Sequence, residues 1–306
     1  MAMWRYCISG LDVAADIALP GAQTTMSAAR APEVTMRRAC VPESLGVGAS
    51  RGLDWEMANG DFLWHVPSVA RFLVRQGNEI AFKVEDGVDD DDVAVYLLGS
   101  AFGILLHQRG RLVLHASAIA VNGKAVLFCG PAGAGKSTLA AALVKSGHAF
   151  LNDDVCHIAV DSEGAPTVSS DGRLLKLWAD AVRQLKLEDR RRTPVFKRMD
   201  KFYISPPGET MVAARPLAAI YVLRGAGTAR AIDIENLDLA QAAMLLRCNA
   251  YRPPLVAEMG LEASYFGDSI AVLRHAGAFY LARPAEFSAM PQLIRRLEAH
   301  WEQIGL

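Results

Sequence analysis

The chain lacks the cysteine pattern of a secreted or zinc-binding protein. Its five cysteines are an odd number, lie scattered along 306 residues and include no C-x-x-C pair. A disulfide framework needs paired cysteines and a zinc site needs clustered ones, so we expect reduced thiols in a cytoplasmic protein. The five are Cys7, Cys40, Cys129, Cys156 and Cys248.

Long apolar runs and an excess of one charge are also missing. The formal net charge is −1, which leaves no basic surplus for binding nucleic acid. No run approaches the roughly eighteen apolar residues that a membrane span needs, and the first residues lack a secretory pattern. We therefore expect neither nucleic acid nor a membrane as a partner. Apolar residues make up 52% of the chain, enough for the core of one large or two medium domains.

One motif is present without a mismatch. Residues 130–138 read GPAGAGKST, which fits G-x-x-x-x-G-K-[ST], and they lie between an apolar strand pattern (125–129) and an Ala/Leu-rich helix pattern (139–144). Glycines allow backbone N–H groups to turn inward around phosphates, and a helix N-terminus favours negative charge. We expect a nucleoside triphosphate, with ATP as the default because no guanine-specific pattern is visible. The expected nucleotide-binding residues are Gly130, Gly133, Ala134, Gly135, Lys136, Ser137 and Thr138.

The stretch before this loop predicts a hairpin that brings a histidine to it. Asn122 and Gly123 separate two apolar runs, which is the pattern of a type I′ turn. If the turn has two residues, Val121 pairs with Lys124 and His115 lies opposite Gly130. A single histidine near an apolar strand is commonly structural, but this register favours a place at the mouth of the phosphate loop.

The stretch after the loop carries paired carboxylates. The helix is expected to end at Gly147, and a short strand (149–151) then leads to Asp153 and Asp154. In a strand–helix–strand unit the two strands are parallel and share the edge where ligands bind. One carboxylate could hold Mg²⁺ and the other accept a proton, and their side chains are expected on opposite faces of the strand. The alternative is that both only cap a turn.

The distribution of apolar, polar and acidic residues divides the chain into three segments. Residues 1–90 are expected to form a small β-rich domain, with a hairpin from 69–74 and 79–84, and with either a substrate-binding or a lid role. Residues 91–110 form a connecting helix, and the acidic run 89–92 is better explained as its N-terminal cap than as a metal site. Residues 111–306 form the phosphate-loop domain, which ends in an amphipathic helix.

A basic segment offers groups for a substrate. Residues 190–201 contain six Lys or Arg side chains, and a solvated charged stretch is the ordinary explanation. Arg198 and Lys201 lie among apolar residues, so they are candidates for binding a triphosphate or a substrate carboxylate. Arg252, beside Tyr251 and two prolines, is a third candidate.

The spacing of these pieces resembles a known family. Asp153 follows Lys136 by only seventeen residues, and His115 precedes Lys136 by twenty-one. The chain resembles the HPr kinase/phosphorylase family, whose catalytic domain is related to phosphoenolpyruvate carboxykinases. The matching pieces are residues 115–117, 130–137 and 147–148, followed by the two aspartates. The resemblance implies an α/β fold with a phosphate-loop catalytic domain and a smaller β-rich N-terminal domain.

The same resemblance implies roles for the site residues. Asp153 would be the base that takes the proton from an acceptor hydroxyl. Asp154 would orient His115 or help to hold Mg²⁺, Lys136 would steady the transferring phosphate, and Ser137 would be a metal ligand. The cofactors implied are ATP and Mg²⁺, and the enzyme implied is a serine kinase.

One difference from the HPr enzymes narrows the choice of substrate. The Glu-containing, Arg-Gly-rich signature of the HPr enzymes is absent, and residues 171–178 (DGRLLKLW) stand in its place. Most of the chain is more similar to the HPr-kinase-like tailoring enzymes of lasso-peptide gene clusters, through residues 6–11, 19–20, 98–110, 201–203 and 249–252. That similarity implies the C-terminal serine of a precursor peptide as the acceptor. A kinase of a folded carrier protein and a nucleotide-binding switch stay as alternatives, and a homo-oligomer stays open.

Overall fold

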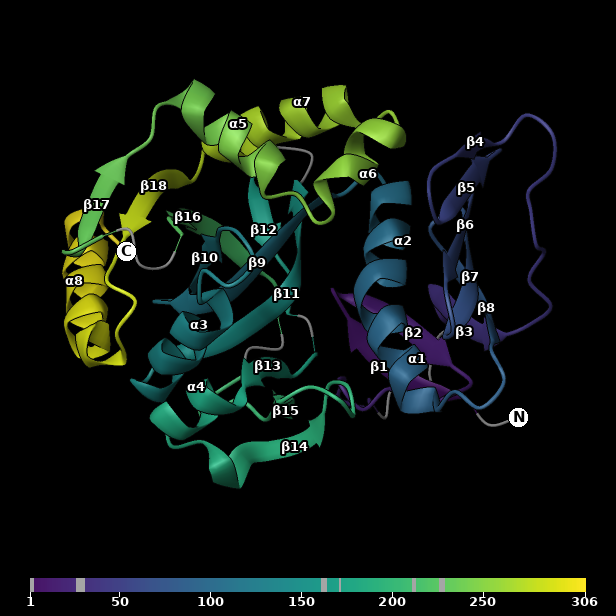
Figure 1. The fold of residues 1–306 in the computed structure, drawn as a ribbon. Coiled ribbons are helices and arrows are strands. Elements are labelled where there is room, and N and C mark those ends of the chain that lie inside the picture. Colours follow the sequence, from purple (N-terminus) through teal and green to yellow (C-terminus); the bar gives the residue numbers. More distant parts are fainter. Residues whose placement is uncertain (1–2, 26–30, 161–163, 171, 211–212, 226–228) are drawn as a thin grey trace.

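The chain is a mixed α/β protein with several sheets (Figure 1). The computed structural model describes residues 3–25, 31–160, 164–170, 172–210, 213–225 and 229–306. Within these residues, every helix is too short or too polar to pass through a bilayer.

The first part of the chain forms an eight-stranded sheet, at the right of Figure 1. Side chains alternate between its faces, so Phe72 and Val74 enter the main core while Leu73 joins a small cluster on the other side. The predicted hairpin is confirmed, because β7 and β8 pair antiparallel. In pairing order the strands are β1 (Trp4–Ile8), β2 (Leu11–Ala15), β3 (Val34–Arg38), β8 (Glu79–Val84), β7 (Ala70–Arg75), β6 (Asp61–Val66), β5 (Trp55–Ala58) and β4 (Ser50–Arg51).

A continuous helical stretch lies between strands β5 to β8 of this sheet and the second half of the chain (Figure 1). It consists of α1 (Asp90–Tyr96), the π-helical segment η1 (Leu97–Ala101) and α2 (Phe102–Gln108). Three aspartates occupy the first turn of α1, where the positive end of the helix dipole favours carboxylates, as the sequence predicts. The predicted capping is not seen as a hydrogen bond, because the side chain of Asp89 at the N-cap position accepts none. Apolar side chains of all three segments pack in the same core as the sheet, and Val113, Val155 and Tyr251 extend that core into the second half of the chain.

The second half is built on a seven-stranded sheet. Its pairing order is β10-β9-β11-β12-β16-β18-β17, and an additional pairing of β10 with β16 joins the first five strands into a ring. Both β10 and β11 run antiparallel to β9, so they are parallel to each other with β9 between them. The strands are β9 (Leu112–Val121), β10 (Lys124–Cys129), β11 (Ala149–Val160), β12 (Pro166–Val168), β16 (Arg215–Leu223), β17 (Asp233–Asn236) and β18 (Gly277–Ala282).

The strand after the phosphate loop is longer than the sequence analysis predicts. We expected a short strand over 149–151 that ends before the aspartates, but β11 runs from Ala149 to Val160 and carries both aspartates in its interior. The ten-residue strand β9 pairs along β11 as far as Leu112 with Ile158, and this long partner holds the chain extended past the polar residues. An irregularity near Phe150 and Asn152 accommodates the change of register.

A three-stranded sheet and several helices complete the second half. The small sheet contains β13 (Leu175–Trp178), β15 (Lys201–Ile204) and β14 (Arg191–Pro194), in that order. The predicted amphipathic helix is confirmed as α8, whose buried side chains include Leu297 and Trp301. The helices are α3 (Lys136–Lys145), α4 (Ala179–Gln184), η2 (Glu188–Arg190), α5 (Leu239–Cys248), α6 (Pro253–Glu258), α7 (Glu262–Leu273), η3 (Phe287–Ala289) and α8 (Met290–Gln303).

Candidate functional site

The phosphate loop joins the end of β10 to the start of α3. Gly130, Gly133 and Gly135 have φ values of 144°, 80° and 84°, in the region where a side chain is strained. A Cβ on Gly130 would also lie 2.8 Å from the Leu223 carbonyl oxygen. The loop therefore needs glycine both for its turn and for its close packing against β16. It ends at the N-terminus of α3, where backbone N–H groups are free to bind an anion.

Lys136 lies at the first position of α3 with its ammonium group folded onto the loop. It donates hydrogen bonds to the carbonyl oxygens of Gly130 (2.8 Å) and Pro131 (3.1 Å). Burial lowers the pKa of Lys136, against the opposing effects of Cys129 and of the two aspartates. A partly desolvated cation inside a ring of backbone dipoles is suited to bind phosphate oxygens.

The hairpin register predicted from Asn122 and Gly123 is confirmed. Val121 pairs with Lys124, and the pairing continues to Cys129 opposite Ala116, so His115 is the next residue of β9 beside the loop. On its other edge, β9 pairs Ala116 with Asp154. Cys129, Ala116 and Asp154 therefore lie side by side across three neighbouring strands, and this places the end of β10 close to the acidic pair of β11.

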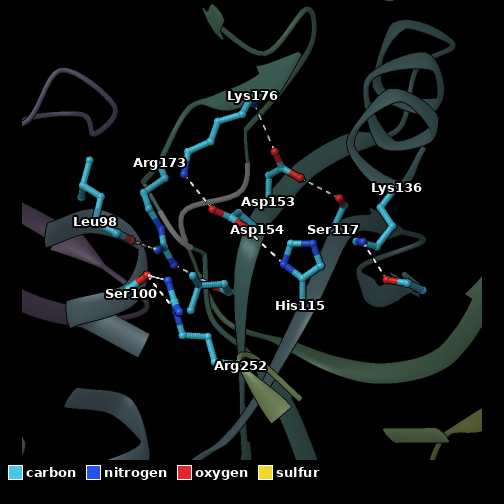
Figure 2. A network of polar contacts seen from close by, with 12 residues as sticks. Leu98, Ser100, His115, Ser117, Lys136, Asp153, Asp154, Arg173, Lys176 and Arg252 are labelled. Carbon is cyan, nitrogen blue, oxygen red and sulfur yellow. Dashed lines mark hydrogen bonds and ion pairs between the residues drawn. The ribbon is translucent and has the colours of Figure 1, made fainter. Parts of the chain in front are cut away.

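The two aspartates face one cavity. Asp154 has a positive φ of 78°, which interrupts the alternation of side chains along β11. For this reason both carboxylates line the same cavity, where regular alternation would have turned them to opposite faces. Figure 2 shows the pair between Lys176 and His115.

Asp153 is the more enclosed of the two, with 2% of its surface exposed. One carboxylate oxygen accepts a hydrogen bond from the Ser117 hydroxyl at 2.6 Å, and the other accepts one from the backbone N–H of Lys176 at 3.1 Å. These two donors fix the orientation of the carboxylate (Figure 2). A carboxylate oxygen has two lone pairs, so each retains capacity for a further hydrogen bond.

Asp154 is held by two basic side chains. Its Oδ2 accepts a hydrogen bond from Lys176 Nζ at 2.7 Å, and its Oδ1 lies 3.3 Å from His115 Nδ1. Burial alone would raise the pKa of Asp154, but Lys176 and His115 together hold that pKa well below its ordinary range. Burial lowers the pKa of Lys176, and Asp154 outweighs burial and raises it. The pair is therefore ionised at neutral pH.

The small sheet supplies Lys176 and Trp178, which the sequence analysis did not assign to the site, beside the predicted Lys201. Lys176 pairs with Tyr203 and Trp178 with Lys201, and Lys176, Trp178 and Lys201 line the cavity, while Leu175 and Leu177 pack in the core with α3. The alternating pattern in 175–178 was the signal available in the sequence. It predicts a strand with one polar face, but nothing in it says that the face meets β11.

Together these elements enclose a cavity of about 250 Å³. Its carboxylates and hydroxyls suit Mg²⁺, which is usually held by one or two carboxylates together with phosphate oxygens and water. The cavity residues that could serve as Mg²⁺ ligands are Ser137, Asp153 and Asp154. The complete lining is His115, Ala132, Gly133, Gly135, Lys136, Ser137, Thr138, Asp153, Asp154, Lys176, Leu177, Trp178 and Lys201.

Of the three substrate candidates, only Lys201 lines this cavity. Arg198 lines a different one, between α1 and the segment before β15. Arg252 lies beside η1, where it donates to the Ser100 hydroxyl at 2.9 Å and has its guanidinium 5.1 Å from the centre of the Trp64 ring. Its backbone has a φ of 51° at the start of α6, and this directs the side chain to the first half of the chain.

Arg173 is another group missed from the sequence, and it connects η1 to the site. The side chain is buried and donates to the carbonyl oxygens of Leu98 (2.6 Å) and Val155 (2.8 Å). Val155 directly follows Asp154, so this arginine ties the helical stretch to the acidic part of β11 (Figure 2). Asp171, the first residue of the 171–178 stretch, lies outside the described residues.

We predict that the Lys176 and Asp154 pair stabilises the fold. The Lys176→Met variant leaves a largely buried carboxylate without its ammonium partner and should lower the free energy of unfolding by about 3 kcal/mol. The folded chain holds the pKa of Asp154 below its ordinary 3.8, so the contribution is complete above that pH and is lost as the pH falls further. Urea unfolding at several pH values measures both effects.

The matched control for this prediction is the double variant Asp154→Asn with Lys176→Met. It removes both charges and should be more stable than Lys176→Met alone. Equal stability of the single and double variants would show that the carboxylate left without its partner carries no cost, and would contradict this prediction.

Comparison with known proteins gives a limited result. No family model matches the chain, and no curated protein matches it. Among solved structures, the HPr(Ser) kinase/phosphatase from Coxiella burnetii is similar, with 14% sequence identity over 62% of this chain and 98% of that chain. The TM-score is 0.32, too low to indicate a function for this chain.

Proposed function

We propose that this protein is an ATP- and Mg²⁺-dependent kinase that phosphorylates a serine hydroxyl of a peptide. The observation that carries the proposal is one cavity of about 250 Å³ containing both the phosphate loop and a buried, oriented carboxylate. A phosphate loop alone binds a nucleotide. A carboxylate held beside it adds a group that can take a proton from an acceptor.

Nucleotide binding is assigned to the loop and to three ammonium groups. The backbone N–H groups of 130–135 and the N-terminus of α3 bind the phosphates, and Lys136 exchanges its loop carbonyls for β- and γ-phosphate oxygens. Lys176 and Lys201 lie on the opposite wall of the cavity and add positive charge there. Phosphoryl transfer depends mainly on such positioning and charge neutralisation.

The residues present fit Mg²⁺, with Ser137 and Asp154 as its protein ligands. The bound ion would supply neutralisation of the charge that develops on the phosphates. Asp154 suits this role because its low pKa keeps it ionised. His115 contacts the same carboxylate and positions it.

Asp153 is assigned as the base. The acceptor oxygen forms a bond to the γ-phosphorus while the bond to the oxygen bridging the β- and γ-phosphates breaks. The proton of the acceptor hydroxyl passes to Asp153, and ADP leaves. Ser117 and the backbone of Lys176 hold the carboxylate for this transfer. A serine hydroxyl is a weak nucleophile, so a base within hydrogen-bond reach increases its reactivity.

The sequence resemblance supports a precursor peptide of the lasso type, with serine at its C-terminus, as the acceptor. The test is to incubate the protein with Mg²⁺-ATP and short synthetic peptides that end in serine, and to record peptide mass. We expect the gain of one phosphate. A nucleotide that binds without modification of any peptide would contradict the proposal and would favour a folded carrier protein or a nucleotide-driven switch.

A further inference from the structure

A second cavity lies close to the phosphate site and is larger, about 680 Å³. One wall consists of the turn before β7, the loop that leads into α1, which includes Val88, and α1 itself, through Asp92 and Tyr96. The other wall is the segment 196–199, between β14 and β15. These walls come from the two halves of the chain.

The segment 196–199 is held in place by its own hydrogen bonds. The Val195 N–H donates to the Lys201 carbonyl at 2.8 Å, the Met199 N–H donates to the Phe196 carbonyl at 3.0 Å, and the Ala179 N–H donates to the Asp200 carbonyl at 2.7 Å. The segment is therefore a closed loop with ends fixed to the small sheet. Its position relative to the phosphate site is set by that sheet.

The two cavities adjoin across this loop. Met199 lines the larger cavity and Lys201 lines the phosphate cavity. Their Cα atoms are separated by two peptide units, at most about 7.6 Å. Tyr203, the strand partner of Lys176, packs in a small cluster with Val195, against which Val95 of α1 and Phe196 also pack, so the end of α1 lies near the small sheet.

The lining of the larger cavity is apolar in the middle and charged at the rim. The Tyr96 and Phe196 rings meet edge to face, with centres 5.8 Å apart, and Met199 is 38% exposed. Lys197 forms an ion pair with Asp89 and so joins the two walls. Among the described residues, Arg198 forms no ion pair, while Lys201 adds a second basic side chain on the side of the phosphate cavity.

We propose that this cavity, lined by Tyr96, Phe196, Arg198 and Met199, binds the acceptor peptide; the proposal depends on the kinase function above. An apolar side chain of the peptide lies against the Tyr96 and Phe196 rings. A carboxylate side chain of the peptide, a few residues before the serine, pairs with Arg198, because an unpaired guanidinium at the rim complements a negative group. The serine, a few residues along an extended peptide at about 3.4 Å per residue, then reaches the carboxylate of Asp153.

The test compares three variants, Phe196→Ala, Met199→Ala and Arg198→Ala, on peptides that end in serine and carry one acidic and one apolar residue before it. We expect KM for the peptide to rise about tenfold, equivalent to 1.4 kcal/mol, with kcat and the Kd for Mg²⁺-ATP unchanged. Arg198→Ala should also lose the preference for Asp over Asn at the acidic position of the peptide. The matched control is Phe266→Ala, a 63% exposed aromatic on α7. An unchanged KM in all three variants would overturn the proposal.

A binding measurement separates this proposal from the kinase function. The fluorescence anisotropy of the same peptides, labelled at the N-terminus, reports docking without turnover. Binding that Phe196→Ala weakens, without phosphorylation by the wild type, would retain the docking site and reject the kinase. Failure of every peptide to bind the wild type would reject the docking site, and thermal unfolding checks that each variant is folded.

Discussion

Asp153→Asn is expected to slow phosphoryl transfer by about 10²- to 10⁴-fold, the range by which positioned bases contribute. The amide has nearly the shape of the carboxylate but cannot take a proton from the acceptor hydroxyl. The loop, Lys136 and Ser137 are untouched, so affinity for Mg²⁺-ATP should change little. Single-turnover kinetics with a peptide acceptor gives the rate, and calorimetric titration with nucleotide gives the affinity.

Two further variants serve as controls for this result. Asparagine offers one acceptor oxygen where aspartate offers two, so this oxygen can accept from the Ser117 hydroxyl or from the Lys176 N–H, but not from both, and the amide N–H would donate to Ser117 instead. The variant Ser117→Ala removes one of these contacts and leaves the base, so it should reduce the rate far less. If Asp154→Asn abolishes transfer while folded Asp153→Asn retains it, the roles of the two aspartates are reversed.

Lys136→Met is expected to weaken Mg²⁺-ATP binding by about 30-fold or more, because a charge-assisted hydrogen bond is worth roughly 2 kcal/mol and its phosphate partners would lose it. Transfer should fall further, since the same ammonium group faces the charge that develops on the γ-phosphate. The rise in unfolding temperature that Mg²⁺-ATP causes in the wild type should largely disappear. Differential scanning fluorimetry at several nucleotide concentrations measures this loss.

The nucleotide-free protein separates this effect from misfolding. Lys136 is partly desolvated and its partners are carbonyl oxygens of the loop, so methionine should leave the unfolding temperature without nucleotide nearly unchanged. Lys145→Met, in the last turn of the same helix, is the matched control, because it removes an equal charge from α3 far from the phosphate loop. A Lys136→Met protein that is still stabilised by nucleotide would contradict the assignment of the loop.

Local patterns predicted the parts of the site that depend on neighbouring residues. The turn at Asn122 and Gly123 set the pairing of β9 with β10, because a two-residue turn leaves one register. The hairpin of β7 and β8 and the apolar face of α8 were predicted in the same way, from the spacing of apolar residues along the sequence. In each case the deciding contacts lie within one turn or one helix.

Predictions that required a partner distant in sequence were less complete. The strand expected to end before Asp153 continues because β9 pairs along it, and the length of that pairing depends on both strands. Lys176 was missed because its importance arises from Asp154, which lies on another sheet. Arg198 and Arg252 were grouped with Lys201 by composition, but the fold directs them to other surfaces.

The sequence by itself determined that the chain has a phosphate loop, that a histidine adjoins it, and that two aspartates follow it. These conclusions need only a glycine pattern, a turn and a short spacing, which act through local backbone geometry. The tertiary structure decided that the two aspartates share one cavity, that Lys176 neutralises Asp154, and that a second cavity adjoins the site. Those features depend on the positive φ of Asp154 and on contacts between three sheets, and no local pattern encodes how separate sheets pack.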